Sequence, residues 1–189
     1  MPKIAVVTSS ARRGRQSLNV ARWVKEEADR RGDADYEIIN ISELELPVWD
    51  EATPPAMKRY GEKITKRWST TIGRYDGFVF IASERHPSIP GALKNALNHL
   101  SPEFHDKAAG FVSYGSAGGA EAVEHLRATL SGMQMAYVHE PVAMSLFTDF
   151  RNDGDFAPTR SSGNRLHGML DELLPRTRAL ESAREKVSA

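Results

Sequence analysis

The chain has 189 residues, enough to bury a substantial core, and we expect a single domain over residues 1–189. Lysine plus arginine and aspartate plus glutamate number 25 each, so no bulk charge attracts nucleic acid or an anionic membrane. Cysteine is absent, which excludes disulfides and thiol chemistry, and neither a membrane-spanning run nor a secretory leader is evident. We therefore expect a cytoplasmic protein without a nucleic-acid or membrane partner.

Apolar segments alternate with segments of helical periodicity along the chain. The expected strands are residues 4–7, 36–41, 78–82, 108–113 and 138–145. The expected helices are residues 17–28, 57–72, 91–100, 123–130 and 164–174. Ser88 is a candidate N-cap of the third helix, and Pro90 is expected just inside its start. Pro175 ends or kinks the last helix, and we expect the polar tail 176–189 to fray.

This alternation predicts an α/β fold with a doubly wound parallel sheet of five strands and helices on both faces. In such sheets, ligands bind beyond the carboxyl ends of the strands, where the strand order reverses. The long loops at those ends are residues 8–16, 42–56, 83–89, 114–119 and 146–162. The ligand site is therefore expected among these loops.

The first loop, residues 8–16, has the composition of a phosphate site. It follows an apolar strand and leads into a helix, so backbone N–H groups and the positive end of the helix dipole meet there. The hydroxyl and guanidinium donors in and next to this loop are those of Ser9, Ser10, Arg12, Arg13, Arg15 and Ser17. Gly14 is the only glycine of the loop, so neither the dinucleotide fingerprint nor the P-loop pattern fits. A mononucleotide such as FMN remains, and a solvated basic turn is the alternative.

A second candidate loop lies within residues 113–120, SYGSAGGA. Its three glycines let the backbone approach a flat ligand, although a tight turn between strand and helix would use the same glycines. The nucleophile elbow G-x-S-x-G would need a glycine two positions before Ser116, where this chain has Tyr114. A serine hydrolase therefore fits poorly.

A third loop, residues 83–90, contains Glu84 and His86, which form either an acid/base pair or a helix-capping pair that faces water. The six histidines of the chain show none of the close spacings that bring imidazoles together on a metal. We predict no metal site.

These segments resemble motifs of the NADPH-dependent FMN reductase family, flavodoxin-like proteins that include azo and quinone reductases. Residues 9–15 resemble its G-S-T-R-x-G-R phosphate loop, with Ser9 in place of the first glycine, and residues 46–55 its L-P-x-x-D-E-x-x-P-P loop. Residues 90–97 match its P-G-x-L-K-N-A signature, the most specific of these matches, and residues 113–119 match its S-x-G-x-x-G-G loop. Residues 146–150 resemble a late segment of actinobacterial-looking members.

The resemblance implies a flavodoxin-like sheet of strand order 2-1-3-4-5 that binds FMN and takes its electrons from NADPH or NADH. The phosphate would be held by the first loop and the isoalloxazine ring by residues 115–119. The cofactor-binding residues implied in this way are Ser10, Arg12, Arg15, Ser17, Glu84, Arg85, His86, Ser88, Tyr114, Gly115, Ser116, Gly118 and Gly119. The flavin would carry the chemistry, so no catalytic side chain is expected. Electrons would pass to a small-molecule acceptor, and Trp49 or Phe147 would serve the contacts of a homodimer or homotetramer.

One loop departs from the family pattern. The family usually has P-E-Y-N before its P-G-x-L-K-N motif, whereas here Ser83, Arg85 and His86 replace Pro, Tyr and Asn, and only Glu84 is kept. Because this loop normally lies against the flavin ring, the charge of Arg85 or His86 would act on the reduced ring or on the NADPH phosphate. Two alternatives to a flavin or quinone-type reductase stay open: a reductase specialised for a step of secondary metabolism, and a flavin-free binding or electron-carrier protein.

Overall fold

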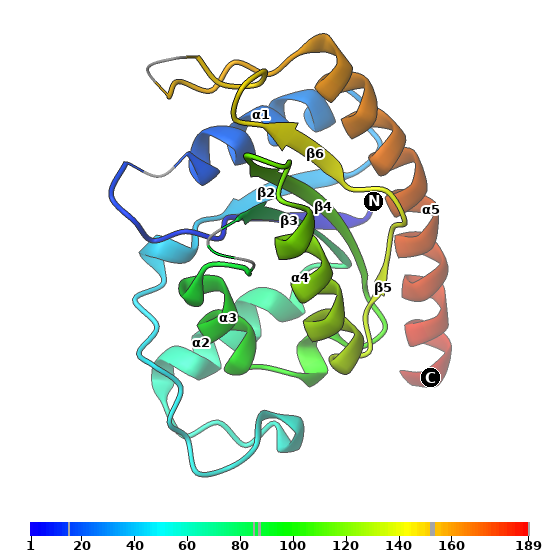
Figure 1. Cartoon of the computed structure of the whole chain (residues 1–189). Coiled ribbons are helices and arrows are strands. Elements are labelled where there is room, and N and C mark those ends of the chain that lie inside the picture. Colours follow the sequence, from blue (N-terminus) through cyan, green and yellow to red (C-terminus); the bar gives the residue numbers. More distant parts are fainter. Residues whose placement is uncertain (15, 85, 87, 152–153, 189) are drawn as a thin grey trace.

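A parallel sheet forms the centre of the fold (Figure 1). The computed structural model describes residues 1–14, 16–84, 86, 88–151 and 154–188. The strands are β1 (Lys3–Val7), β2 (Asp35–Ile39), β3 (Gly77–Ser83), β4 (Ala108–Gly115), β5 (Ala136–Tyr137) and β6 (Val142–Ser145). Their order is β2-β1-β3-β4-β5, and β6 also pairs with β4. All pairings of these strands are parallel, which confirms the predicted order and the doubly wound sheet.

Helices cover both faces of the sheet (Figure 1). On one face lie α1 (Ser17–Asp29) and α5 (Arg160–Ser188), and on the other lie α2 (Lys63–Gly73), α3 (Gly91–Asn98) and α4 (Ala120–Gly132). The short 3-10 turns are η1 (Ile41–Glu43), η2 (Pro55–Met57) and η3 (Pro102–Phe104). Because the central strands are covered on both faces, their residues are apolar almost without interruption.

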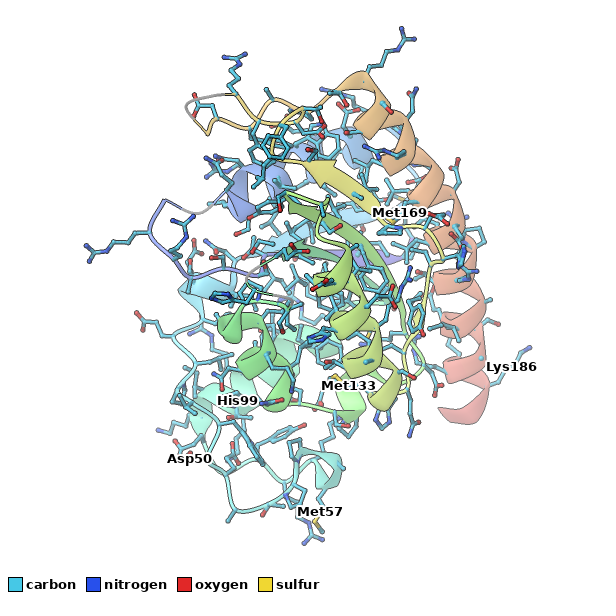
Figure 2. All side chains as sticks on the ribbon, viewed as in Figure 1. Asp50, Met57, His99, Met133, Met169 and Lys186 are labelled. Carbon is cyan, nitrogen blue, oxygen red and sulfur yellow. The ribbon has the colours of Figure 1, made fainter. Side chains whose placement is uncertain are left out.

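Glycine allows α5 to lie close to β4. A Cβ atom on Gly110 would overlap the sulfur of Met169, which points from α5 toward the sheet (Figure 2). The same helix face carries Leu166, Leu170 and Leu173, all fully buried. These side chains are the apolar stripe that the sequence predicts for the last helix.

The fifth predicted strand, 138–145, is interrupted, and that prediction is wrong in part. β5 pairs with the start of β4 and β6 with its end, and residues 138–141 lie between them. The N–H of Val138 still binds Ala109 O (2.9 Å), but the N–H of His139 binds Glu172 Oε1 of α5 (3.0 Å) instead. Pro141 has no N–H to donate. The ladder therefore breaks before β6 resumes it.

The predicted helix 57–72 begins only at Lys63. Lys58 has a left-handed backbone (φ 51°), and the N–H of Gly61 binds the carboxylate of Glu51 (2.6 Å), so the chain turns here. Met57 is 53% exposed and points outward (Figure 2), whereas Tyr60 donates its hydroxyl to the buried carboxylate of Glu103 (2.8 Å). Met57 and Tyr60, which contributed to the helical spacing in the sequence, therefore lie in a turn before the helix and not in the helix itself.

Ser88 is not the cap of α3. Pro90 occupies the N-cap position, and Ser88 Oγ binds His125 Nδ1 of α4 instead (3.1 Å). The expectation for Pro90 is therefore off by one residue, since it precedes the helix rather than starting it.

α5 is much longer than the predicted 164–174 and continues through Pro175 to Ser188, so the expected frayed tail is wrong over the described residues. The polar side chains after Pro175 bind the body of the protein. Thr177 is buried, Arg178 donates to Asp33 O (3.0 Å), and Arg184 donates to the carbonyl of Asp106 and the carboxylate of Asp76 (3.3 Å). These contacts lie before β2, β3 and β4, at the amino edge of the sheet.

No helix in the part of the chain that the structure describes has the length and apolar content needed to cross a membrane.

Candidate cofactor site

A cavity of about 740 Å³ lies at the carboxyl edge of the sheet, where the predicted loops meet. Four segments supply its walls: the loop after β1, the end of β3 and the start of α3 with the loop between them, the end of β4, and the segment after β6. The lining residues are Ser10, Ala11, Arg12, Gly14, Gln16, Ser83, Glu84, Pro90, Gly91, Ala92, Tyr114, Gly115, Leu146, Phe150, Arg151 and Gly154. The volume falls in the range of cavities that hold small molecules and nucleotides.

The start of α1 contains hydrogen-bond donors that have no acceptor among the described residues. Ser17, its first residue, is fully buried, and its Oγ has no hydrogen-bond partner among the described residues. Among the described residues, no side chain caps the helix, and its first turn contains no acidic residue. The first N–H groups of a helix have no partner inside the helix. Buried polar groups are almost always paired, so a hydroxyl left over beside these N–H groups fits an anion such as a phosphate.

The rest of the loop after β1 is held by neighbouring segments. Ser9 Oγ accepts the N–H of Ser83 at the end of β3 (3.2 Å), which joins two walls of the cavity. Ser10 Oγ accepts the N–H of Arg12 (3.3 Å), and both residues line the cavity. Gly14 takes the left-handed conformation (φ 68°) that this loop requires. Arg15, the other arginine expected at the phosphate, lies outside the described residues.

The glycines after β4 shape a tight turn that leads into α4. Gly118 and Gly119 have φ values of 75° and 77°, and a Cβ on Gly119 would lie 2.9 Å from the Cβ of Ser113. Ser113 Oγ donates to Gly118 O (2.7 Å) and closes the turn. Gly115 lines the cavity itself, and a Cβ there would lie 3.1 Å from the Cβ of Glu84. The absence of a Cβ on Gly115 therefore lets Glu84 and the N–H of Gly119 lie against the end of β4.

The loop after β3 contributes Glu84, whose N–H binds Tyr114 O (3.1 Å). His86 is exposed with a left-handed backbone (φ 48°) and does not line the cavity. No hydrogen bond joins Glu84 to His86 within the described residues, so the structure gives the acid/base pairing no geometric support. Arg85 lies outside the described residues.

The segment after β6 forms a fourth wall; it lies in the loop 146–162, which was expected at this edge of the sheet without any cofactor-binding residue. Phe150 and Phe156 form an antiparallel bridge, and we call residues 150–151 and 154–156 the β6–α5 hairpin. The Phe150 ring packs against Tyr114 (5.5 Å between centroids) and Phe156 (5.3 Å), and Phe156 packs against Trp23 of α1 (5.7 Å). This aromatic cluster fixes the hairpin between the end of β4 and the middle of α1.

Residues 2–149 match the family model of the NADPH-dependent FMN reductases. The chain belongs to this family. An NAD(P)H-dependent FMN reductase of Schizosaccharomyces pombe is 34% identical over 150 residues, which cover 78% of this chain and 75% of the relative. A quinone reductase of Pseudomonas putida is 32% identical over 161 residues, 77% of this chain and 81% of the relative.

A solved structure shows the same fold. FerB, a flavoenzyme NAD(P)H:(acceptor) oxidoreductase of Paracoccus denitrificans, superposes with a TM-score of 0.75 and 18% identity, covering 95% of this chain and 98% of that chain. This likeness bears out the flavodoxin-like fold that the resemblance implied.

The match to the FMN reductase family ends at Asp149, and this residue anchors the β6–α5 hairpin. The side chain is buried. Oδ2 accepts the N–H of Ser145 (3.0 Å) and the hydroxyl of Thr148 (3.0 Å). Oδ1 accepts the N–H and the hydroxyl of Thr159 (3.2 Å each) and the hydroxyl of Ser162 (2.5 Å). Burial raises the pKa of Asp149, but these hydrogen bonds outweigh burial, and the net shift is downward.

Only some of the predicted cofactor-binding residues line the cavity of this member of the FMN reductase family. Ser10, Arg12, Glu84, Tyr114 and Gly115 do, whereas Ser17, Gly118 and Gly119 build the adjoining helix start and turn, and His86, Ser88 and Ser116 do not line it. The lining residues Phe150, Arg151 and Gly154 were missed. The dipeptide Asp153-Gly154 between Phe150 and Phe156 is a hairpin signal that would have indicated this wall.

Proposed function

We propose that this protein is an NAD(P)H-dependent oxidoreductase that binds FMN in the cavity and passes electrons to a small-molecule acceptor. The observation that carries the proposal is Ser17 Oγ, which is buried at the start of α1 without a partner among the described residues. The phosphate of FMN would accept its hydrogen bond. Membership of the FMN reductase family supports the same cofactor and reductant.

Bound FMN would supply hydride acceptance from NAD(P)H and onward electron transfer. The Ser17 hydroxyl and the first N–H groups of α1 hold and orient the phosphate, and Arg12 adds positive charge beside it. Gly115 lines the cavity at the end of β4, where a planar ring would lie against the strand end. Phe150 and Leu146 supply apolar surface that keeps water from the ring.

The acceptor is proposed to be a quinone-type compound. The support is the quinone reductase of Pseudomonas putida, which is 32% identical over most of both chains, and the apolar surface of Leu146 and Phe150 in the cavity. Steady-state assays with quinones, azo dyes and free flavins at a fixed NADPH concentration test this class directly. Turnover that is restricted to free flavins would contradict it.

A spectroscopic titration tests the cofactor assignment. The purified protein should take up FMN, and NADPH added under anaerobic conditions should bleach the visible flavin absorbance. Ser17→Ala should weaken FMN affinity about tenfold, since it removes one hydrogen bond to a charged group, and should leave riboflavin affinity unchanged because riboflavin lacks the phosphate. Ser131→Ala, an exposed serine on α4, is the matched control.

A second readout of Ser17→Ala does not depend on the cofactor. Removing a buried hydroxyl that has no partner should leave the FMN-free protein as stable as wild type or more stable. Colourless protein that takes up no FMN and leaves NADPH unoxidised would overturn the proposal and favour a flavin-free binding or electron-carrier protein.

We also propose that the protein acts in the cytoplasm, as one domain, in a homodimer or homotetramer. Phe147 supports the assembly, because it is 80% exposed and follows Leu146 of the cavity wall. Trp49, the other candidate, is half-buried, and its backbone N–H donates to Asn95 Oδ1 (3.0 Å). Light scattering of wild type and Phe147→Ser measures the assembly, and a wild-type monomer at all concentrations would refute it.

A further inference from the structure

The β6–α5 hairpin adds a positive charge to the cavity from outside the segment that matches the family model. Arg151 lines the cavity, and the family match ends at Asp149. The loop after β1 and the hairpin therefore both line this cavity. The following inference rests on the proposed function, because it concerns which ligand groups that cavity holds.

The backbone of Arg151 is held firmly. Its N–H binds Asp155 O (2.8 Å), and its carbonyl accepts the N–H of Gly154 (2.8 Å). Gly154 O in turn accepts a hydrogen bond from Gln16 Nε2 (2.9 Å), the residue before α1. The hairpin is thus tied directly to the loop that precedes the phosphate-binding helix start.

The aromatic cluster and Asp149 complete this support. Phe150, the neighbour of Arg151, packs against Tyr114 and Phe156, and Asp149 joins the segment to the start of α5 through Thr159 and Ser162. The side chain of Arg151 is exposed. A fixed backbone with an accessible guanidinium is the arrangement in which arginine binds a ligand oxyanion with two donors.

The charges of the cavity favour anions. Among the described lining residues, Arg12 and Arg151 are cationic and Glu84 is the one acid, and the positive end of the α1 dipole adds to the cations. FMN brings one phosphate group, and NADPH brings several. A second guanidinium next to the phosphate loop matches this excess of negative charge.

We propose that Arg151 is a phosphate-binding residue of the cavity, which the β6–α5 hairpin brings beside Gln16 and the start of α1. Its guanidinium donates to a phosphate group of FMN or of NAD(P)H. In either case the hairpin, and not only the loop after β1, sets the affinity of the cavity for phosphorylated ligands. Exposure of the side chain makes this contribution sensitive to salt.

Binding measurements on Arg151→Gln separate the two phosphates. If the contact is to FMN, affinity of the apoprotein for FMN falls about tenfold while riboflavin affinity is unchanged. If the contact is to the 2′-phosphate of NADPH, the affinity for FMN stays at the wild-type value, and the KM rises for NADPH but not for NADH. A rise for both nicotinamide cofactors indicates their shared pyrophosphate. Each of these losses should shrink at high salt, and Arg151→Lys should recover part of it.

Arg22→Gln is the matched control, because it removes an exposed arginine of α1 that does not line the cavity. Arg151→Gln values within twofold of this control for FMN, NADPH and NADH would overturn the inference while leaving the proposed function standing. Wild-type protein that binds neither FMN nor NADPH would overturn both. Thermal unfolding of FMN-free Arg151→Gln should match that of wild type, since the hydrogen bonds of residue 151 that hold the hairpin are made by the backbone.

Discussion

Asp149→Asn tests whether one buried carboxylate holds the fourth wall of the cavity. Asparagine has nearly the same shape, but its amide presents two N–H donors on one side. The hydroxyls of Thr148, Thr159 and Ser162 can rotate and become acceptors. The backbone N–H groups of Ser145 and Thr159 cannot, and they face opposite carboxylate oxygens. Either orientation of the amide therefore leaves one backbone N–H facing another donor.

The expected loss follows from that mismatch. One buried N–H without an acceptor costs about 1 to 3 kcal/mol, and the remaining hydrogen bonds lose the strength that the charge gave them, so the free energy of unfolding should fall by about 3 kcal/mol. For a chain of this size that corresponds to roughly 6 to 12 °C in Tm. Urea unfolding of the FMN-free protein at neutral pH measures the loss. Asp50→Asn, an exposed aspartate in the loop after η1, should change stability by less than about 0.5 kcal/mol.

The pH dependence supplies an independent check. Because the pKa of folded Asp149 lies below that of the unfolded chain, the stabilisation is fully present above the unfolded pKa of about 3.9 and is lost as the pH falls through the folded pKa. The difference between wild type and Asp149→Asn should therefore shrink in acid. A variant as stable as wild type at neutral pH, or a difference independent of pH, would refute the reasoning.

Two further substitutions test other parts of the fold. Gly119→Ala should lower the free energy of unfolding by about 2 kcal/mol or more, because φ is 77° and the new Cβ would lie 2.9 Å from Ser113 Cβ. Gly132 has open space around it, so the control Gly132→Ala should be neutral or stabilising in the same chemical unfolding assay. Burial lowers the pKa of Lys107 to about 8, so the folded protein binds this proton less tightly than the unfolded chain. Stability of wild type relative to Lys107→Met should therefore rise by about 2 kcal/mol between about pH 8 and pH 10, and a flat difference in that interval would contradict the assigned burial.

The sequence pattern was sufficient for the first four strands of the sheet and for α1. Residues 4–7 form an unbroken apolar run, and Val20 and Val24 repeat at helical spacing, so β1 and α1 follow from local pattern alone. The order of the strands came from the family motifs rather than from periodicity.

The errors at the fifth strand and at the end of the last helix share a physical cause, since both depend on partners distant in the chain. β5 and β6 separate because Glu172 of α5 takes the N–H of His139, and α5 continues past Pro175 because Arg178 and Arg184 find acceptors on loops before β2, β3 and β4. From the sequence alone, a polar helix end whose arginines bind backbone carbonyls elsewhere in the fold cannot be distinguished from a solvated tail.

The hairpin was missed for a related reason. Phe150 and Phe156 look like isolated apolar residues in a polar loop, and only the Tyr114 and Trp23 rings show what they pack against. The expected residues Arg15 and Arg85 remain predictions, because they lie outside the described part of the chain.

The length of α5 determines what can be attached to the molecule. Its last turns lie at the amino edge of the sheet (Figure 1), where Arg184 contacts Asp76 and Asp106. The cavity lies at the opposite, carboxyl edge. A linker, affinity tag or electrode surface joined after Ser188 would therefore emerge at the far end of the protein, and diffusing reactants would keep an unobstructed path to the cavity.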